Sequence, residues 1–246
     1  MSERLQKWLA NKGLGSRREI ERWIEAGRVS VDGNVASLGA KVDGTERIQV
    51  DGKPVRVPER PVRKRTIMYH KPPGEICTRS DPQGRKTIFH SLPRVLGARW
   101  ISVGRLDFQT SGLLILTTDG ELANRLMHPS SQLQREYVVR ALGEPSEQQL
   151  AQLTRGVELE DGPAKFDSLL ITDGEGANKS YLVKVSEGRN RIVRRLFEQA
   201  GCRVNRLMRV SFGPLALPRD LRAGQHRELT KGELEQLLQS IKGDAI

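Results

Sequence analysis

One carboxylate lies in a segment whose composition suits a functional loop. Asp107 falls within residues 104–112, which lie between two aliphatic segments, 101–103 and 113–116. This segment begins with Gly104 and ends with Thr110-Ser111-Gly112. Such a segment is often a turn that is held by local bonds between side chains and backbone. No second acidic residue lies within ten positions of Asp107, so a mechanism with paired carboxylates has little local support. The residues alone therefore leave two interpretations, a structural turn or a single catalytic carboxylate.

A second segment is unusually rich in arginine. Residues 186–222 contain nine arginines, no lysine and three acidic residues, which gives +6 of the chain's net charge of +11. The planar guanidinium group suits bidentate contacts with phosphate and stacking on bases. Val193, Leu196, Phe197 and Ala200 form one apolar helical face, so some of these arginines are also explained as its solvated side. Their density favours contact with an anionic partner.

The composition of the whole chain favours the same class of partner. The 246 residues include 41 Lys and Arg against 30 Asp and Glu. This balance disfavours an ordinary neutral metabolic enzyme and favours a polyanion as partner. Only 4% of the residues are aromatic, which argues against a broad platform for base stacking.

Cysteine and histidine usage argues against several other classes. Cys77 and Cys202 are 125 positions apart, and the four histidines show no metal-ligand spacing, so we expect neither a disulfide scaffold nor a metal site. The first residues are charged and the longest aliphatic run is 113–116, which predicts no signal peptide and no membrane partner. We expect a cytoplasmic protein.

The elements that must position these residues begin with a small N-terminal unit. Leu5, Trp8 and Leu9 have helical spacing, and Ser16 with Glu19 forms a capping box for a second helix. Residues 29–35 predict a hairpin around Asp32-Gly33. We expect a first domain at residues 1–55.

A linker and a larger domain follow. Residues 54–66 hold three prolines and five basic residues, so we place the linker at 56–63 and the second domain at 64–243. Strands are expected at 66–69, 101–103, 113–116, 137–141, 168–171 and 181–185, and helices at 121–127, 146–155, 190–200 and 234–241. Several strands follow one another without helices between them, which predicts an α+β fold with a mixed sheet.

The N-terminal unit resembles the S4 RNA-binding domain. The resemblance depends on Gly-Ser-Arg-Arg-Glu at residues 15–19 and Gly-Arg-Val-Ser-Val-Asp-Gly at residues 27–33. In S4 domains the two helices present basic side chains to structured RNA. The resemblance implies RNA contacts by four arginines, Arg17, Arg18, Arg22 and Arg28.

The larger domain resembles the RNA pseudouridine synthases, in the branch that carries an S4 domain and acts on ribosomal RNA. Residues 104–120 match that family's signature around its aspartate, and Arg135-Glu136-Tyr137 and residues 187–195 match two later motifs in the same order. Together with the S4 domain, the resemblance covers residues 2–225. It implies a mixed, largely antiparallel central sheet with the active-site cleft across its middle.

The resemblance also implies roles for individual residues. Asp107 would be the nucleophile, Tyr137 the aromatic residue beside the target uracil, and Arg194 the partner of the Asp107 carboxylate. Carboxylates are known nucleophiles at anomeric carbons, and attack at C1′ of the ribose or at C6 of the uracil both remain open. The reaction requires no cofactor. RNA contacts would come from Arg105, which is also suited to fill the space left by a flipped nucleotide, and from Arg189, Arg191 and Arg195. Many synthases have His-Gln where this chain has Arg191-Ile192, so contacts at these positions do not follow directly from the family.

Three segments favour the large ribosomal subunit as the source of the substrate. Residues 117–130, 159–163 and 188–191 are most similar to family members that modify large-subunit RNA. We therefore expect 23S ribosomal RNA, or a large-subunit precursor, as partner of a monomeric enzyme. Two alternatives stay open: a synthase for a different ribosomal uridine, and a non-catalytic S4 protein that assists ribosome assembly.

Overall fold

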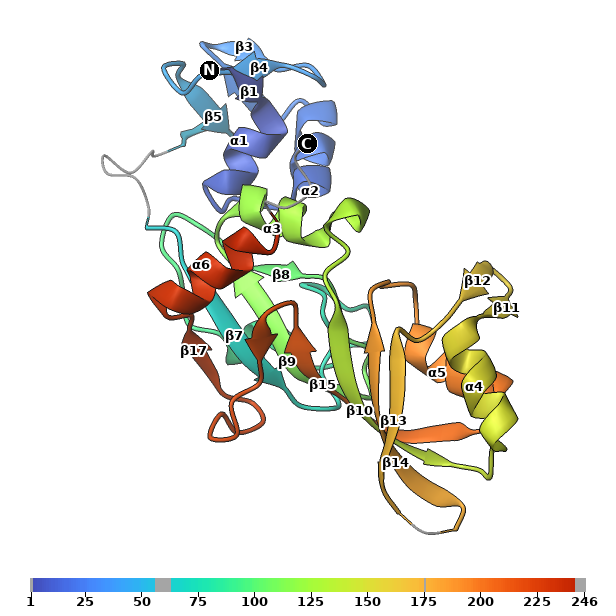
Figure 1. The fold of residues 1–246 in the computed structure, drawn as a ribbon. Helices are drawn as coiled ribbons and strands as arrows, with labels where there is room; N and C mark the ends of the chain where they lie inside the picture. Colours follow the sequence, from blue (N-terminus) through green and yellow to red (C-terminus); the bar gives the residue numbers. More distant parts are fainter. Residues whose placement is uncertain (1, 56–62, 175, 242–246) are drawn as a thin grey trace. The chain divides into compact units, whose positions relative to one another are not determined.

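The chain forms two compact units. The computed structural model describes residues 2–55, 63–174 and 176–241. The first unit comprises the chain up to residue 65 together with residues 93–101 and 118–120, and the second comprises the remainder. Figure 1 shows the helices and strands of each unit.

The first unit packs two helices against short strands. Its elements are β1 Glu3–Arg4, α1 Leu5–Asn11, α2 Arg17–Glu25, β2 Val29–Val31, β3 Asn34–Val35, β4 Lys41–Val42, β5 Ile48–Val50 and β6 Lys53–Pro54. The Oγ of Ser16 accepts a hydrogen bond from the Glu19 amide (3.1 Å), which confirms the capping box. Asp32 and Gly33 adopt positive φ angles of 49° and 84° between β2 and β3, which confirms the hairpin. Leu5, Leu9 and Ile20 are fully buried in the core.

The expected domain limits are only partly covered by the structure. Most of the expected linker, residues 56–62, and the last two residues of the expected second domain, 242–243, lie outside the described residues. Residues 93–101 and 118–120 cluster with the first unit although they follow it in sequence. The limits 1–55 and 64–243 therefore stay predictions.

The second unit is built on a nine-stranded sheet. The strand order is β13-β14-β10-β15-β9-β7-β17, with β16 beside β15 and β8 beside β9. The strands are β7 Thr66–Lys71, β8 Ile101–Val103, β9 Thr110–Thr117, β10 Arg135–Leu142, β13 Ser168–Asp173, β14 Asn178–Val185, β15 Arg203–Phe212, β16 Leu215–Ala216 and β17 His226–Glu228. The hairpin β11 Val157–Leu159 and β12 Gly162–Ala164 forms a separate two-stranded sheet.

The strand directions confirm the expected fold class. The β15–β9 pair is parallel, whereas the β13–β14, β14–β10, β10–β15, β9–β7 and β7–β17 pairs are antiparallel. The helices are α3 Gly120–Met127, α4 Glu147–Arg155, α5 Ile192–Gln199 and α6 Lys231–Gln239, with short 3-10 turns at Ile88–Ser91 and Pro129–Ser131. The result is the α+β fold with a mixed, largely antiparallel sheet that the sequence predicts.

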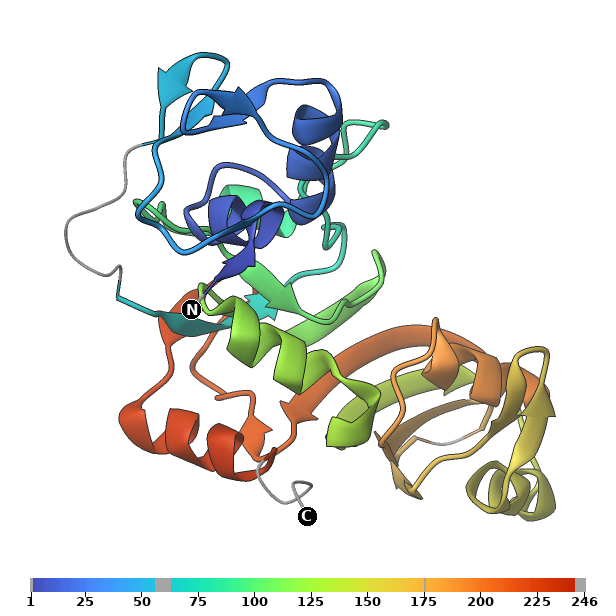
Figure 2. The same ribbon diagram turned by 90° about the horizontal axis from the view of Figure 1, so that it is seen from above.

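Two parts of the sheet are buried in different ways. The centre of β9, Leu113 to Leu116, is fully buried. Toward the β13 edge, α4 and α5 cover one face of the sheet, and the hairpin β11–β12 lies at the same end (Figure 2). There the ring of Phe197 packs against Phe166 and Tyr181, with centroids 5.5 and 5.0 Å apart. Among the described helices, none is long and apolar enough to span a bilayer.

Candidate active site

A cleft of about 850 Å³ opens within the second unit, next to the loop between β8 and β9. Its wall brings together segments that are far apart in sequence: the loop of Asp107, strand β10 with Tyr137, the 186–193 segment and strand β15. Asp107 is partly exposed, whereas Tyr137 is 8% exposed. The two residues that the family resemblance implies as nucleophile and aromatic neighbour therefore line the same cavity, which is large enough for a nucleotide.

Almost every backbone carbonyl oxygen around Asp107 accepts a hydrogen bond. The Oγ of Ser102 donates to the Gly104 oxygen (2.6 Å), and the Sγ of Cys77 donates to the Leu106 oxygen (3.4 Å). The Thr110 amide donates to the Asp107 oxygen (3.0 Å), and the Gly74 amide donates to the Phe108 oxygen (2.8 Å). Residues 104–110 form this loop, the Asp107 loop. Its hydrogen bonds fix the direction in which the Asp107 carboxylate leaves the backbone.

A buried lysine completes the support of the Asp107 loop. The Nζ of Lys71 donates to the carbonyl oxygens of Pro72 (2.9 Å), Thr110 (2.9 Å) and Phe108 (3.5 Å). The side chain is completely buried. Burial lowers the pKa of Lys71, whereas the negative charges around it, that of Asp107 included, act in the opposite direction. Sequence reasoning missed this residue, and its only signal was a lysine that ends a buried strand directly before Pro72.

Arg194 contacts the Asp107 loop rather than the Asp107 carboxylate. Its Nη1 donates to the Val204 oxygen (2.8 Å) and its Nη2 to the Gln109 oxygen (3.4 Å). Across the described residues, no ion pair joins Arg194 to Asp107. The expected ion pair between Arg194 and the Asp107 carboxylate is therefore not found. Arg194 instead contacts the backbone oxygen of Gln109, two residues after Asp107. Burial lowers the pKa of Arg194, and the charge of Asp107 partly offsets this effect.

Strand β15 brings a second buried arginine to the cleft. Arg209 is 2% exposed, lines the cleft, and is the cross-strand partner of Tyr137. On its other side it pairs with Gly112, where an added Cβ would lie 2.2 Å from the Arg209 oxygen. Gly112 has a φ of 106°, so both its conformation and this close approach require glycine. Neither β15 nor Arg209 was predicted from the sequence.

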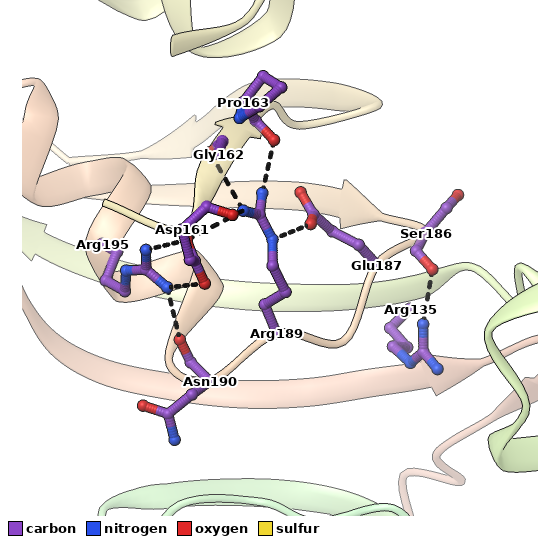
Figure 3. A network of polar contacts seen from close by, with 9 residues as sticks. All are labelled: Arg135, Asp161, Gly162, Pro163, Ser186, Glu187, Arg189, Asn190 and Arg195. Carbon is purple, nitrogen blue, oxygen red and sulfur yellow. Dashed lines mark hydrogen bonds and ion pairs between the residues drawn. The ribbon is translucent and has the colours of Figure 1, made fainter. Parts of the chain in front are cut away.

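Arg189 and Arg195 are engaged in an internal network (Figure 3). The Nε of Arg189 donates to Glu187 (2.5 Å), its Nη1 to Asp161 (3.0 Å), and its Nη2 to the Pro163 oxygen (2.7 Å). Arg195 pairs with both oxygens of Asp161. The hydrogen bond from Arg195 is the main reason that the pKa of Asp161 falls to about 2. These contacts fasten the hairpin β11–β12 to the segment that lines the cleft, so an RNA phosphate would have to compete with carboxylates for either arginine.

The other expected RNA contacts differ in their surroundings. Arg105 and Arg191 are exposed and line the cleft, and Arg191 forms one long ion pair with Glu198 (3.7 Å). In the first unit, Arg28 is bound by Asp51 through two hydrogen bonds of 2.7 and 2.6 Å. Arg17, Arg18 and Arg22 are exposed, and within the described part of the chain they form no ion pair. These three are the S4 arginines most available to an external anion.

Metal-ligating side chains do not cluster in the described part of the chain. Within residues 2–55, 63–174 and 176–241, no group of three His, Cys, Asp or Glu side chains is placed to bind an ion. Both cysteines, Cys77 and Cys202, are free thiols.

Comparisons with known proteins cover both units. The family described as RNA pseudouridylate synthase matches residues 65–199, and the S4 domain matches residues 3–48. "Ribosomal large subunit pseudouridine synthase B" of Salmonella typhimurium is 54% identical over 240 residues, which cover 96% of this chain and 82% of the relative. The protein of the same name from Escherichia coli (strain K12) is 53% identical over 98% of this chain and 84% of its own length. The solved structure described as "Crystal structure of pseudouridylate synthase" superposes with a TM-score of 0.67 at 29% identity, covering 95% of this chain and 99% of that chain.

Proposed function

This chain belongs to the RNA pseudouridylate synthase family, and we propose that it converts uridine to pseudouridine in large-subunit ribosomal RNA, with Asp107 as the nucleophile. The observation that carries the assignment of the site is the position of Asp107, which lies on a backbone loop held at nearly every carbonyl and lines the same cleft as Tyr137. Identities above 50% with relatives named for the large ribosomal subunit support the substrate class.

The chemistry requires one carboxylate and no external group. The target uridine leaves its base stack and enters the cleft, where Tyr137 packs beside the uracil. The Asp107 carboxylate attacks either C1′ of the ribose or C6 of the uracil, and the bond between N1 and C1′ breaks. The uracil turns, C5 bonds to C1′, the bond to Asp107 is released, and the C5 proton passes to solvent while N1 gains a proton. Reactant and product are isomers, so neither an oxidant nor a group donor is consumed.

Binding of the RNA is divided between the two units in this proposal. Arg17, Arg18 and Arg22 on the first unit contact phosphates of structured RNA, since their guanidinium groups are exposed and without carboxylate partners in the described residues. Arg105 and Arg191 contact the RNA at the cleft. Arg28, Arg189 and Arg195 mainly stabilise the protein through their ion pairs.

The cellular setting is part of the same proposal. The enzyme acts as a single chain in the cytoplasm, where its RNA substrate is made in bacteria and where the free thiols of Cys77 and Cys202 stay reduced. A synthase for another ribosomal uridine remains the nearest alternative, because the cleft chemistry is the same for every target. A non-catalytic assembly factor has no need for the supported carboxylate.

Mapping of pseudouridine in ribosomal RNA tests the function. RNA from cells with and without the gene is treated with a carbodiimide that marks pseudouridine and is read by primer extension. The proposal predicts that one or more large-subunit sites lose their signal, and that the purified protein restores it on the RNA from deleted cells. Loss of a small-subunit site alone would establish the nearer alternative, and an unchanged map would contradict the proposal.

A further inference from the structure

Arg209 carries a donor group that the protein itself does not use. Its Nε donates to the Leu113 oxygen at 2.7 Å, which fixes the start of the guanidinium group. Its Nη2 is buried and, in the described part of the chain, has no hydrogen-bond partner. An unpaired donor on a buried cation is unfavourable in the free protein, and the residue lines the cleft. The arrangement therefore points to a partner that arrives with the substrate.

Arg135 brings a second guanidinium group to the same ring. The Cζ of Arg135 lies 5.4 Å from the centroid of Phe212, and the Cζ of Arg209 lies 5.2 Å from it. The β10–β15 register places Arg135 opposite Phe212, as it places Tyr137 opposite Arg209. Arg135 donates to the Ser186 oxygen at 2.8 Å, as Figure 3 shows, and this bond leaves most of its N–H groups unused. Two cations are thus fixed on one aromatic side chain in the cleft wall.

The charges of this pair are not balanced by the protein. Neither Arg135 nor Arg209 forms an ion pair with any residue that the structure describes. Burial lowers the pKa of Arg135; the neighbouring Tyr137 acts in the opposite direction, and the positive charge of Arg209 lowers this pKa as burial does. The contrast with Arg189 is clear, since that arginine of the same cleft is neutralised by Glu187 and Asp161. An anion in the cleft would relieve both the repulsion and the unpaired donor.

We propose that Arg135 and Arg209 form a subsite for one phosphodiester group of the RNA strand that carries the target uridine. This inference rests on the proposed function and deepens it, because it names the anion-binding residues inside the cleft. Guanidinium groups suit this ligand, since they donate paired hydrogen bonds to phosphate oxygens. The subsite would hold the strand in register with Asp107, next to the ring of Tyr137.

Salt dependence of RNA binding tests the subsite on the protein side. Arg135→Gln and Arg209→Gln are compared with Arg140→Gln and Arg206→Gln, whose residues face each other on the same two strands and are exposed. The ligand is a large-subunit RNA fragment that the wild type modifies. Each cleft variant should weaken binding roughly tenfold or more and reduce the slope of log affinity against log salt by about 0.7–0.9. The two control variants should lose less affinity than the cleft variants, and the slope of log affinity against log salt should change less in them.

A change on the RNA side tests the same subsite with the wild-type protein, so a folding defect of Arg209→Gln does not affect the result. A neutral methylphosphonate replaces each phosphate near the target uridine in turn. At one position the replacement should weaken binding to the wild type about tenfold and should weaken binding to Arg135→Gln by far less. If every position weakens both proteins equally, the subsite is wrong. If the wild type forms no pseudouridine in the unmodified fragment, the proposed function fails instead.

Discussion

The Nζ of Lys71 lies 2.9 Å from the carbonyl oxygen of Thr110, the residue three positions after Asp107. The same ammonium group lies 2.9 Å from the Pro72 oxygen, and its side chain is completely buried. The bond to Thr110 ties the end of β7 to the start of β9 at the Asp107 loop. Lys71 is therefore a positioning residue, since it holds backbone and lies outside the cleft lining.

Replacement of this lysine should affect turnover more than binding. Lys71→Met keeps most of the length of the side chain but removes the three donated hydrogen bonds, so the Asp107 loop loses its fixed direction. Displacement of a reacting group by about 1 Å can cost on the order of a hundredfold in rate, and we expect a loss between tenfold and a hundredfold. Saturating single-turnover rates measure this loss, and affinity for RNA should stay within a few-fold. A variant that melts normally and turns over at the wild-type rate would contradict this role.

Replacement of Arg194 should also reduce turnover more than affinity for RNA. Arg194→Ala removes the contacts with Gln109 and Val204 from a buried site, and the loss of such charge-assisted bonds is on the order of a few kcal/mol. Without the bond to the Gln109 oxygen the Asp107 loop is held less firmly, so the saturating single-turnover rate should fall by roughly tenfold to a hundredfold. Arg203→Ala, an exposed neighbour, should leave this rate near normal. Equal single-turnover rates of the two variants would contradict the role of Arg194 in holding the Asp107 loop.

Gly112 offers a test of the close contact between β9 and β15. Gly112→Ala places a Cβ 2.2 Å from the Arg209 oxygen, whereas Gly162→Ala, at the same φ of 106°, meets nothing within 4 Å. The control should lose about 1–2 kcal/mol of unfolding free energy from backbone strain. Gly112→Ala should lose roughly 3 kcal/mol or more, because backbone atoms must move. Urea unfolding measures both, and equal losses would mean that the close approach costs nothing.

The Asp161 contacts predict a pH dependence. The hydrogen bond from Arg195 lowers the pKa of Asp161 from 3.8 to about 2, so its contribution is complete above pH 3.8 and disappears as the pH falls toward 2. Asp161→Asn removes this contribution at every pH. The difference in melting temperature between the two proteins should be constant above about pH 5 and shrink between about pH 4 and 2. A difference that does not change over this range would show that the ion pairs do not stabilise the hairpin.

Local patterns predicted most of the elements well. The capping box at Ser16 and the turn at Asp32-Gly33 depend only on neighbouring residues, and both are found in the structure. The alternation that predicts β10 and the aliphatic run that predicts β9 are equally local. In contrast, Arg203, Arg206 and Arg209 interrupt the hydrophobic pattern of β15, and β10 is joined to β15 with two register shifts. The longest strand of the sheet was therefore missed.

The site was predicted only where the family resemblance names residues. Asp107 and Tyr137 line one cleft, as the resemblance implies. Lys71 and Arg209 act through contacts with Thr110 and Leu113 on another strand, and such long-range contacts leave no spacing in the sequence. For the same reason the sequence does not show that Arg189 forms ion pairs with Asp161 and Glu187 in the fold.

Tritium release from labelled RNA shows whether Asp107 performs the isomerisation. Large-subunit ribosomal RNA labelled at C5 of uridine loses its tritium to water when C5 bonds to the ribose, so release counts turnovers. Asp107→Asn keeps nearly the same shape but replaces a carboxylate with a poor nucleophile. We expect the variant to bind this RNA within several-fold of the wild type and to release no tritium above background. Release at the wild-type rate would contradict it.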